Sequence, residues 1–434
     1  MAKYGQDTVR TAKNQSSHYI RINGTLKVYV STNGCTEGRL SSTNAEHFFR
    51  NNNLTITKSL EQADYVFFYA CGLTKQTEQE SLIILREIQK KIKNTAKIFV
   101  WGCLPKINPK ALSPIYSGPF IGPMDERRFE AFFLKKTAKP FDNMEIAFGE
   151  GTLISKEAYS HTHIDMFTDA VIFLKKIFDG LQARARKDTK YIIRVAQGCT
   201  GSCTYCSERG VFGAVKSRPI EEIISEFKRG LRKNYTKFSL MATDLGSYGR
   251  DIGCTLPELL KKIIEIDYKR NYKIILNQVN PHYLIEFFSA LEKIFDSGKI
   301  EELCSPVQSG SQRILELMGR RYTAEEWRRY MIKINRKYPR LRLITHFMVG
   351  FPTETDEDFK ATLKLLNPPI FLDSICAFKF SERPNVCASH FSSQISETAK
   401  ELRYKRMRRE YVRMYLLNMA AKIMRGRSNM NKDW

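Results

Sequence analysis

Three cysteines stand close together in the segment Cys199-Thr-Gly-Ser-Cys203-Thr-Tyr-Cys206. Three thiolates at this spacing can hold three irons of a four-iron four-sulfur cubane, because cysteine is the usual ligand of such clusters. The fourth iron would have no protein ligand and would be open to a small molecule. Zinc would require a fourth Cys or His nearby, and this segment holds none. A zinc knuckle or a chance cluster is the alternative interpretation. These three residues are called the barrel cysteines below.

A second set of three cysteines is spread along the N-terminal region. Cys35, Cys71 and Cys103 each directly follow an expected strand, and each has a glycine beside it. The ends of parallel strands meet at one edge of a sheet, so we expect these distant thiols to lie on one rim. The pattern favours a second cluster, also with an open iron; the alternative is three ordinary buried cysteines. These residues are called the N-terminal cysteines below.

The elements that must position both sets alternate between strand and helix, which predicts parallel sheets with helical crossovers. In the first series we expect strands at 26–30, 63–70 and 96–102, and helices at 40–51 and 76–93. In the second series we expect strands at 191–196, 237–242, 273–277, 303–304, 343–349 and 374–380. Helices are expected between them at 220–232, 256–266, 281–295, 312–318, 324–336 and 357–366. The fold class is therefore α/β: a parallel-sheet α/β domain followed by a partial (β/α)6 barrel.

The chain of 434 residues is long enough for two or three domains, and 42% hydrophobic residues exclude a wholly disordered protein. We expect an N-terminal α/β domain over 25–150, which carries the N-terminal cysteines, and a barrel domain over 191–390. The remaining expected segments are a polar arm over 1–24, a linker over 151–190 with a helix at 166–185, and a basic helical tail over 391–434.

Charge is the second constraint on function. The chain has 70 Lys and Arg against 46 Asp and Glu, a net charge of +24, which favours a polyanion such as RNA over a solubility effect. Residues 400–434 hold 11 basic and 3 acidic residues and are typical of a basic helix that either contacts RNA or packs its aromatic stripe on the barrel.

The compartment follows from the same composition. No apolar run approaches the roughly 18 residues of a membrane span, and the N-terminus lacks the apolar centre of a secretory signal. We therefore expect a cytoplasmic protein without membrane contact. Ten cysteines in a reduced compartment then indicate metal binding or chemistry rather than disulfides.

The two cysteine sets and the motifs around them resemble the methylthiotransferases of the radical S-adenosylmethionine (SAM) superfamily, from about residue 26 to about residue 407. The matching motifs are Thr32-Asn-Gly-Cys35, Ala63-Asp64 with Ala70-Cys71, Gly102-Cys103, Gly198-Cys199 through Cys206, Lys216-Ser-Arg-Pro219, Asp244 with Gly246-Ser-Tyr-Gly249, Pro306-Val-Gln-Ser-Gly310, Met318 with Arg320 and Tyr322, and Gly350-Phe-Pro-Thr-Glu-Thr355.

The resemblance implies a catalytic barrel, two four-iron four-sulfur clusters and SAM. In this family one SAM molecule donates a methyl group to sulfur on the auxiliary cluster, and another gives the 5′-deoxyadenosyl radical that abstracts hydrogen from the substrate. The barrel cysteines would then hold the catalytic cluster and the N-terminal cysteines the auxiliary one. The implied partners are a tRNA substrate, methylthiolated on an adenosine next to the anticodon, a reductant such as flavodoxin or ferredoxin, and a sulfur donor.

Five further residues are expected to contact the cofactor. Gln308 and Ser309 follow a barrel strand at its carboxyl end, where site residues collect, and resemble the family's cofactor motif. Tyr205 is placed to lie near the adenine, or only to shield the cluster. Thr243 and Asp244 could contact the ribose or the amino group, or could serve as a local cap.

Some positions depart from the family pattern. Ser207-Glu-Arg-Gly210 replaces an Ile/Pro-containing segment, Ala242-Thr243 replaces Gly-Gln, and His346-Phe347-Met348 displaces an Asp. These positions line the expected barrel mouth, so they bear on the substrate rather than on the radical chemistry. We interpret His346 as a packed strand residue. The other cysteines, interpreted as structural, are Cys254, Cys304, Cys376 and Cys387.

Two rival functions stay open from the sequence. The family usually ends in a small β-rich RNA-binding module, and the 27 residues after Met407 are too few for one, so the acceptor could be a ribosomal protein side chain, a peptide or a metabolite. A non-catalytic iron–sulfur protein that binds RNA or senses redox state is the second rival. The barrel cysteines together with Gln308 argue against it, because a sensor needs no cofactor site.

Overall fold

The structure is a computed structural model that describes residues 26–123, 190–384 and 386–430, with side chains described as far as residue 417. The polar arm expected over 1–24 and the helix expected over 166–185 lie outside the described residues. The linker expected over 151–190 does too, apart from Lys190, which begins a strand.

The first sheet has five parallel strands in the order β2-β1-β3-β4-β5. Its strands are β1 (Lys27–Thr32), β2 (Thr55–Ile56), β3 (Tyr65–Tyr69), β4 (Lys97–Trp101) and β5 (Phe120–Ile121), and its helices are α1 (Thr36–Asn51), α2 (Lys75–Lys91), α3 (Leu104–Ile107) and α4 (Pro109–Leu112). The central strand β3 is buried throughout because helices cover both faces of the sheet. Phe67 packs with Phe49 of α1 on one face, and Phe68 packs with Leu85 of α2 on the other.

The second sheet has six parallel strands, each next to its predecessor in the chain. They are β6 (Lys190–Arg194), β9 (Lys237–Met241), β10 (Lys273–Leu276), β11 (Ile300–Cys304), β12 (Arg342–Val349) and β13 (Ser374–Lys379). The helices between them are α8 (Ile220–Arg232), α9 (Leu256–Ile264), α10 (Pro281–Glu286), α11 (Phe288–Asp296), α12 (Gln312–Leu317), α13 (Ala324–Lys337) and α14 (Asp356–Lys364). This sequential order is that of a partial barrel, so the predicted fold class is confirmed.

The two faces of the barrel sheet differ. Large apolar side chains such as Tyr191, Phe238 and Leu343 point to the helices and form the main core. The strand register places the alternate residues on the opposite face, called the inner face here. It carries Ile192, Ser239, Ile275, Glu302, Cys304, Ile344, His346, Met348, Cys376 and Phe378.

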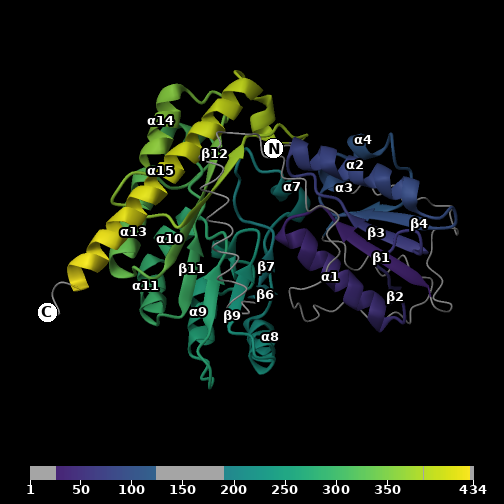
Figure 1. Cartoon of the computed structure of the whole chain (residues 1–434), viewed down its shortest axis with the longest axis horizontal. Helices are drawn as coiled ribbons and strands as arrows, with labels where there is room; N and C mark the ends of the chain where they lie inside the picture. Colours follow the sequence, from purple (N-terminus) through teal and green to yellow (C-terminus); the bar gives the residue numbers. More distant parts are fainter. Residues whose placement is uncertain (1–25, 124–189, 385, 431–434) are drawn as a thin grey trace.

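A long helix, α15 (Glu397–Met430), crosses the outside of β13 and β12 (Figure 1). Met407, Tyr411 and Met414 are buried against the barrel. A helix was expected in this segment, and the part with described side chains packs its apolar stripe on the barrel, which is one of the two readings of the sequence.

Some short elements were not predicted. The expected helix over 281–295 is two helices, α10 and α11, separated at Phe287. A two-stranded antiparallel ribbon, β7 (Ala196–Gln197) with β8 (Lys216–Ser217), and the one-turn helix α7 (Glu208–Phe212) follow the first barrel strand. Elements this short show no hydrophobic periodicity, and they form because neighbouring segments hold them. Phe212 of α7 packs into the core of the N-terminal domain.

Candidate functional site

The barrel cysteines lie in the loop that joins β7 to α7. The backbone N–H of Cys199 donates to the carbonyl of Gly213 at 3.2 Å, and the N–H of Cys206 donates to the carbonyl of Cys203 at 3.3 Å. A Cβ atom on Gly201 would lie 3.2 Å from Cys199 Sγ and 3.8 Å from Cys203 Sγ. The two thiols therefore share the space above this glycine, and Cys206 interacts electrostatically with Cys203.

Burial sets the protonation of these thiols. Burial, with the nearby charge of Asp244, raises the pKa of Cys199 to about 12. Burial, with the nearby charge of Glu208, likewise raises the pKa of Cys206 to about 12. Without metal both residues are protonated thiols at neutral pH, so metal binding there must release protons.

The N-terminal cysteines meet at one edge of the first sheet. Cys35 begins α1, Cys71 follows β3, and Cys103 follows β4 after Gly102, whose positive φ of 105° suits glycine. A hydrogen bond between the thiols of Cys35 and Cys71 raises the pKa of Cys35 and lowers the pKa of Cys71. Burial raises the pKa of Cys103, and its Sγ lies 3.5 Å from the Tyr69 hydroxyl. All three thiols lie within electrostatic reach of one another.

Side chains around Cys71 fix this arrangement. Asn33 accepts a hydrogen bond from the Cys71 N–H at 3.0 Å and donates to the carbonyl of Thr77 at 3.1 Å. The Ser81 hydroxyl donates to the carbonyl of Cys71 at 2.7 Å. Asn33 stands two residues before Cys35 in the sequence, but only the structure shows that it braces a different cysteine.

Neither cysteine set has the geometry of a site for one ion. Among the described residues, no group of three or more His, Cys, Asp or Glu is close enough to hold a single metal ion. In a cubane each cysteine binds a different iron, so the irons and sulfides of the cluster keep the thiols apart. Thiols that lie near one another without meeting at a single point therefore fit a cluster.

Helix α1 of the N-terminal domain docks on the inner face of the barrel sheet. Figure 1 shows α1 on the side of its domain that lies next to the barrel. Arg194 of β6 donates to Glu37 Oε1 at 2.6 Å and to Ser41 Oγ at 3.2 Å. Leu40, on the same face of α1, packs with Ile192 and Met241. Because Cys35 begins this helix, the docking fixes the N-terminal cysteines relative to the barrel.

A second polar contact joins the domains on the side of α2. The Arg383 guanidinium, which is 4% exposed, pairs with Glu78. The backbone N–H of Lys75 donates to the Ser381 hydroxyl at 2.9 Å.

Glu208 lies between the two cysteine sets. Its charge raises the pKa of both Cys206 and Cys103, which belong to different domains. Burial, together with the charge of Glu37, raises the pKa of Glu208 itself to about 7. One cysteine of each set therefore lies within electrostatic reach of Glu208. The sequence marked 207–210 as a departure from the family but gave no reason to place a carboxylate there.

Gln308 has the conformation and environment of a ligand-binding residue. Its φ of 71° is in the left-handed region, and its backbone pairs with β12, donating to the His346 carbonyl at 2.8 Å and accepting from the Met348 N–H at 2.9 Å. The side chain is buried, and its Oε1 atom has no hydrogen-bond partner among the described residues. A buried amide oxygen without a partner fits a site that a polar ligand completes.

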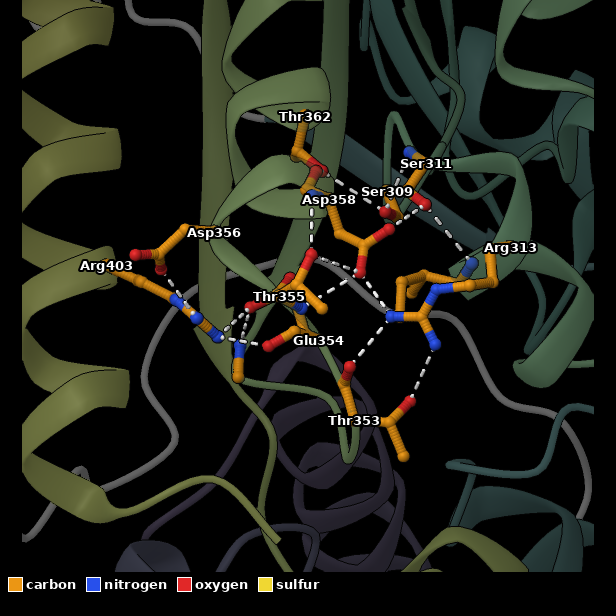
Figure 2. A network of polar contacts seen from close by, with 12 residues as sticks. Ser309, Ser311, Arg313, Thr353, Glu354, Thr355, Asp356, Asp358, Thr362 and Arg403 are labelled. Carbon is orange, nitrogen blue, oxygen red and sulfur yellow. Dashed lines mark hydrogen bonds and ion pairs between the residues drawn. The ribbon is translucent and has the colours of Figure 1, made fainter. Parts of the chain in front are cut away.

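Ser309 makes contacts of a different kind. Its hydroxyl lies 3.1 Å from the Thr362 hydroxyl and accepts a hydrogen bond from the Ser311 N–H at 3.1 Å. Figure 2 shows it within a network that continues through Ser311 to Asp358 and Arg313. Ser309 therefore ties the Gln308 turn to α14, and the structure does not direct its hydroxyl to the barrel cysteines.

Thr243 and Asp244 brace the cysteine loop from the end of β9. The Thr243 hydroxyl accepts from the Gly198 N–H at 3.1 Å. Asp244 accepts from the Gly246 N–H at 3.0 Å, as a cap of the short helix Leu245–Ser247, and its Oδ2 lies 3.6 Å from Cys199 Sγ. The cap reading of Asp244 thus describes its geometry.

Arg320 is the main residue that the sequence reasoning left without a role. Its guanidinium donates to Cys203 Sγ at 3.3 Å and to the carbonyl of Pro306 at 2.8 Å, while its Nε donates to the Tyr322 hydroxyl at 2.9 Å. Tyr205 lies beside it, where burial raises the pKa of its hydroxyl. Arg320 thus joins a barrel cysteine to the strand end that leads into Gln308.

Comparison with known proteins identifies both domains. The radical SAM superfamily matches residues 193–366, and the uncharacterized protein family UPF0004 matches residues 27–117. A probable threonylcarbamoyladenosine tRNA methylthiotransferase of Pyrococcus horikoshii is 29% identical over 377 residues, 87% of this chain and 82% of the relative. A tRNA-2-methylthio-N(6)-dimethylallyladenosine synthase of Caldicellulosiruptor saccharolyticus is 26% identical over 419 residues, 92% of this chain and 81% of the relative.

A solved structure shows the same fold. The radical SAM methyltransferase TsrM of Kitasatospora setae has a TM-score of 0.57 at 12% identity, over 84% of this chain and 77% of that one. The radical SAM match over residues 193–366, which contains the barrel cysteines, makes the second domain a radical SAM domain. At 29% identity, the chain is similar to relatives that are named as methylthiotransferases. Its cofactors include SAM and a four-iron four-sulfur cluster, which the barrel cysteines and Gln308 fit. None of the described helices is long and apolar enough to cross a membrane.

Proposed function

We propose that this enzyme methylthiolates a modified adenosine of tRNA and uses a second four-iron four-sulfur cluster to do so. The observation that carries the proposal is that Cys103 and Cys206, one from each set of three cysteines, have Glu208 as a shared charged neighbour. The two relatives described above are named for modified adenosines of tRNA, and the net charge of +24 favours a polyanionic substrate.

The proposed domain boundaries are 25–150 for the N-terminal domain, 191–390 for the barrel domain and 391–434 for the tail. Each of the two domains would hold one cluster. The barrel cysteines would hold the catalytic cluster, and the N-terminal cysteines the auxiliary one. The clusters and SAM together supply the radical, the sulfur and the methyl group of the reaction. A reductant such as flavodoxin or ferredoxin and a sulfur donor would act as partners.

The protein's own residues would position the cysteines and the cofactor and exclude water from the site. Arg320 holds Cys203 with a charge-assisted hydrogen bond, and such bonds to cluster sulfurs tune the reduction potential. Gln308 presents its buried Oε1 to the cofactor. The contact of α1 with β6 holds the helix that begins at Cys35 against the barrel sheet.

Mass spectrometry of tRNA nucleosides tests the proposal. A strain that lacks this chain should lose a methylthio-adenosine, and expression of the wild-type chain should restore it. Expression of a chain with the N-terminal cysteines replaced by Ala should not restore it. An unchanged nucleoside profile in the deletion strain would contradict a tRNA substrate and favour a ribosomal protein or a metabolite as acceptor.

A further inference from the structure

The inner face of the last three barrel strands carries a group of side chains that the mechanism above does not use. Residues paired across parallel strands share a face, and His346 of β12 pairs with Cys376 of β13, while Met348 pairs with Phe378. Cys304 ends β11 on the same face, paired with Ile344. Helix α1 covers the inner face at the other end of the sheet, on β6 and β9.

Direct contacts join these residues into one wall. His346 Nε2 lies 3.4 Å from Cys304 Sγ. The imidazole meets the ring of Phe378 edge to face, with centroids 5.4 Å apart and an interplanar angle of 72°. Phe378 is 44% exposed although most other large apolar side chains of the barrel are buried, so the described residues leave part of its ring uncovered.

The imidazole of His346 and the thiol of Cys304 are neutral hydrogen-bonding groups of this wall. Burial, with the charge of Arg320, lowers the pKa of His346 to about 4, and burial raises the pKa of Cys304 to about 12. When the Cys304 thiol donates to Nε2, the imidazole proton lies on Nδ1, since the bond at one ring nitrogen sets the tautomer. Nδ1 has no hydrogen-bond partner among the described residues.

The wall adjoins the part of the site assigned to the cofactor. The His346 carbonyl accepts from the Gln308 N–H at 2.8 Å, so the two residues are fixed to each other through backbone. Arg320, whose charge reaches His346, donates to Cys203 Sγ. A molecule held against Phe378 would thus lie on the same side of the sheet as the radical source.

We propose that Phe378 and His346 form the seat of the acceptor base: a planar nucleobase stacks on the uncovered part of the Phe378 ring, and His346 Nδ1–H donates a hydrogen bond to an acceptor atom of that base. The inference rests on the proposed tRNA function and names the residues that select the base. An exposed aromatic ring with a neutral donor beside it suits a nucleobase, because every base has a flat face and hydrogen-bond acceptors at its edge.

Steady-state kinetics with a tRNA anticodon stem-loop test the proposal. Phe378→Leu should raise KM for the RNA about tenfold or more, the scale of one lost base–aromatic stack. His346→Gln should raise KM about fivefold or more, the scale of one lost hydrogen bond. The effect should appear in KM for the RNA rather than in kcat, because both side chains are proposed to contact the base and neither contacts the barrel cysteines. Phe120→Leu and His390→Gln, at exposed positions elsewhere, are the matched controls.

A gain-of-signal variant protects the test against misfolding. Phe378→Trp keeps a stacking surface, so it should retain KM, and stem-loop binding should quench its added fluorescence relative to the wild type. Wild-type KM in both Phe378→Leu and His346→Gln, or no quenching in Phe378→Trp, would overturn the proposal. A wild-type enzyme that forms 5′-deoxyadenosine but methylthiolates no RNA would instead overturn the proposed function beneath it.

Discussion

Replacing Arg383 with Ala should loosen the contact between the two domains and uncouple their chemistry. The Arg383 side chain is 3% exposed and that of Glu78 11%, so removal of the cation strands a buried carboxylate. Breaking such a pair costs about 3–5 kcal/mol, and we expect about 3 kcal/mol here because Asn108 still donates to Glu78 at 2.9 Å.

Two measurements check this expectation. Urea unfolding should show the loss of stability. The ratio of 5′-deoxyadenosine to methylthiolated product should rise, because the barrel cysteines keep their surroundings while the N-terminal cysteines lose a fixed position. Removing both charges, in Arg383→Met with Glu78→Gln, should recover part of the stability, since no unpaired charge is then buried.

The control is Lys262→Ala. Its ion pair with Glu221 also joins two elements, at 3.3 Å, but both side chains are more than half exposed, so urea unfolding should show no change in stability. Wild-type stability and wild-type coupling in Arg383→Ala would refute the reasoning that this pair holds the domains together.

Three further predictions concern the site and its support. Replacing the barrel cysteines with Ala should abolish 5′-deoxyadenosine formation, whereas replacing the N-terminal cysteines should spare it and abolish methylthiolation; product from the second variant would exclude the auxiliary role. Gln308→Ala should weaken SAM binding about tenfold or more in equilibrium dialysis, the scale of one lost hydrogen bond to a charged group, and unchanged binding would remove Gln308 from the cofactor site. Burial raises the pKa of Asp358, but hydrogen bonds from Arg313 and Ser311 outweigh it and lower the pKa to about 2 from 3.8, so its contribution is present above pH 4 and disappears as pH falls towards 2. Asp358→Asn should therefore lower the free energy of unfolding by about 1–2 kcal/mol at pH 7. It should also make that free energy depend less steeply on pH between 4 and 2, and a wild-type slope there would contradict this.

The main elements could be predicted because their patterns are long. The run at 65–70 is apolar without interruption, so it fits a buried central strand, and the observed β3 is Tyr65–Tyr69. The rule that parallel strands end at one edge was enough to expect Cys35, Cys71 and Cys103 near one another, as the structure has them. Their role as cluster ligands stays a prediction.

The docking of the domains could not be predicted from the sequence. Glu37 and Arg194 are 157 residues apart, and no local pattern pairs a helix of one sheet with the inner face of another. The roles of Glu208 and Arg320 depend on that packing and on loops too short for periodicity. Ser309 shows the converse: the motif pointed to the cofactor, but its hydroxyl bonds to Thr362 and the Ser311 backbone.

Iron content with Mössbauer spectroscopy, on protein reconstituted anaerobically, tests the central claim most directly. Two cubanes per chain require about eight irons in the wild type, and about four in the variant whose N-terminal cysteines are Ala. About four irons in the wild type, unchanged by that substitution, would contradict the assignment of Cys35, Cys71 and Cys103 to a second cluster.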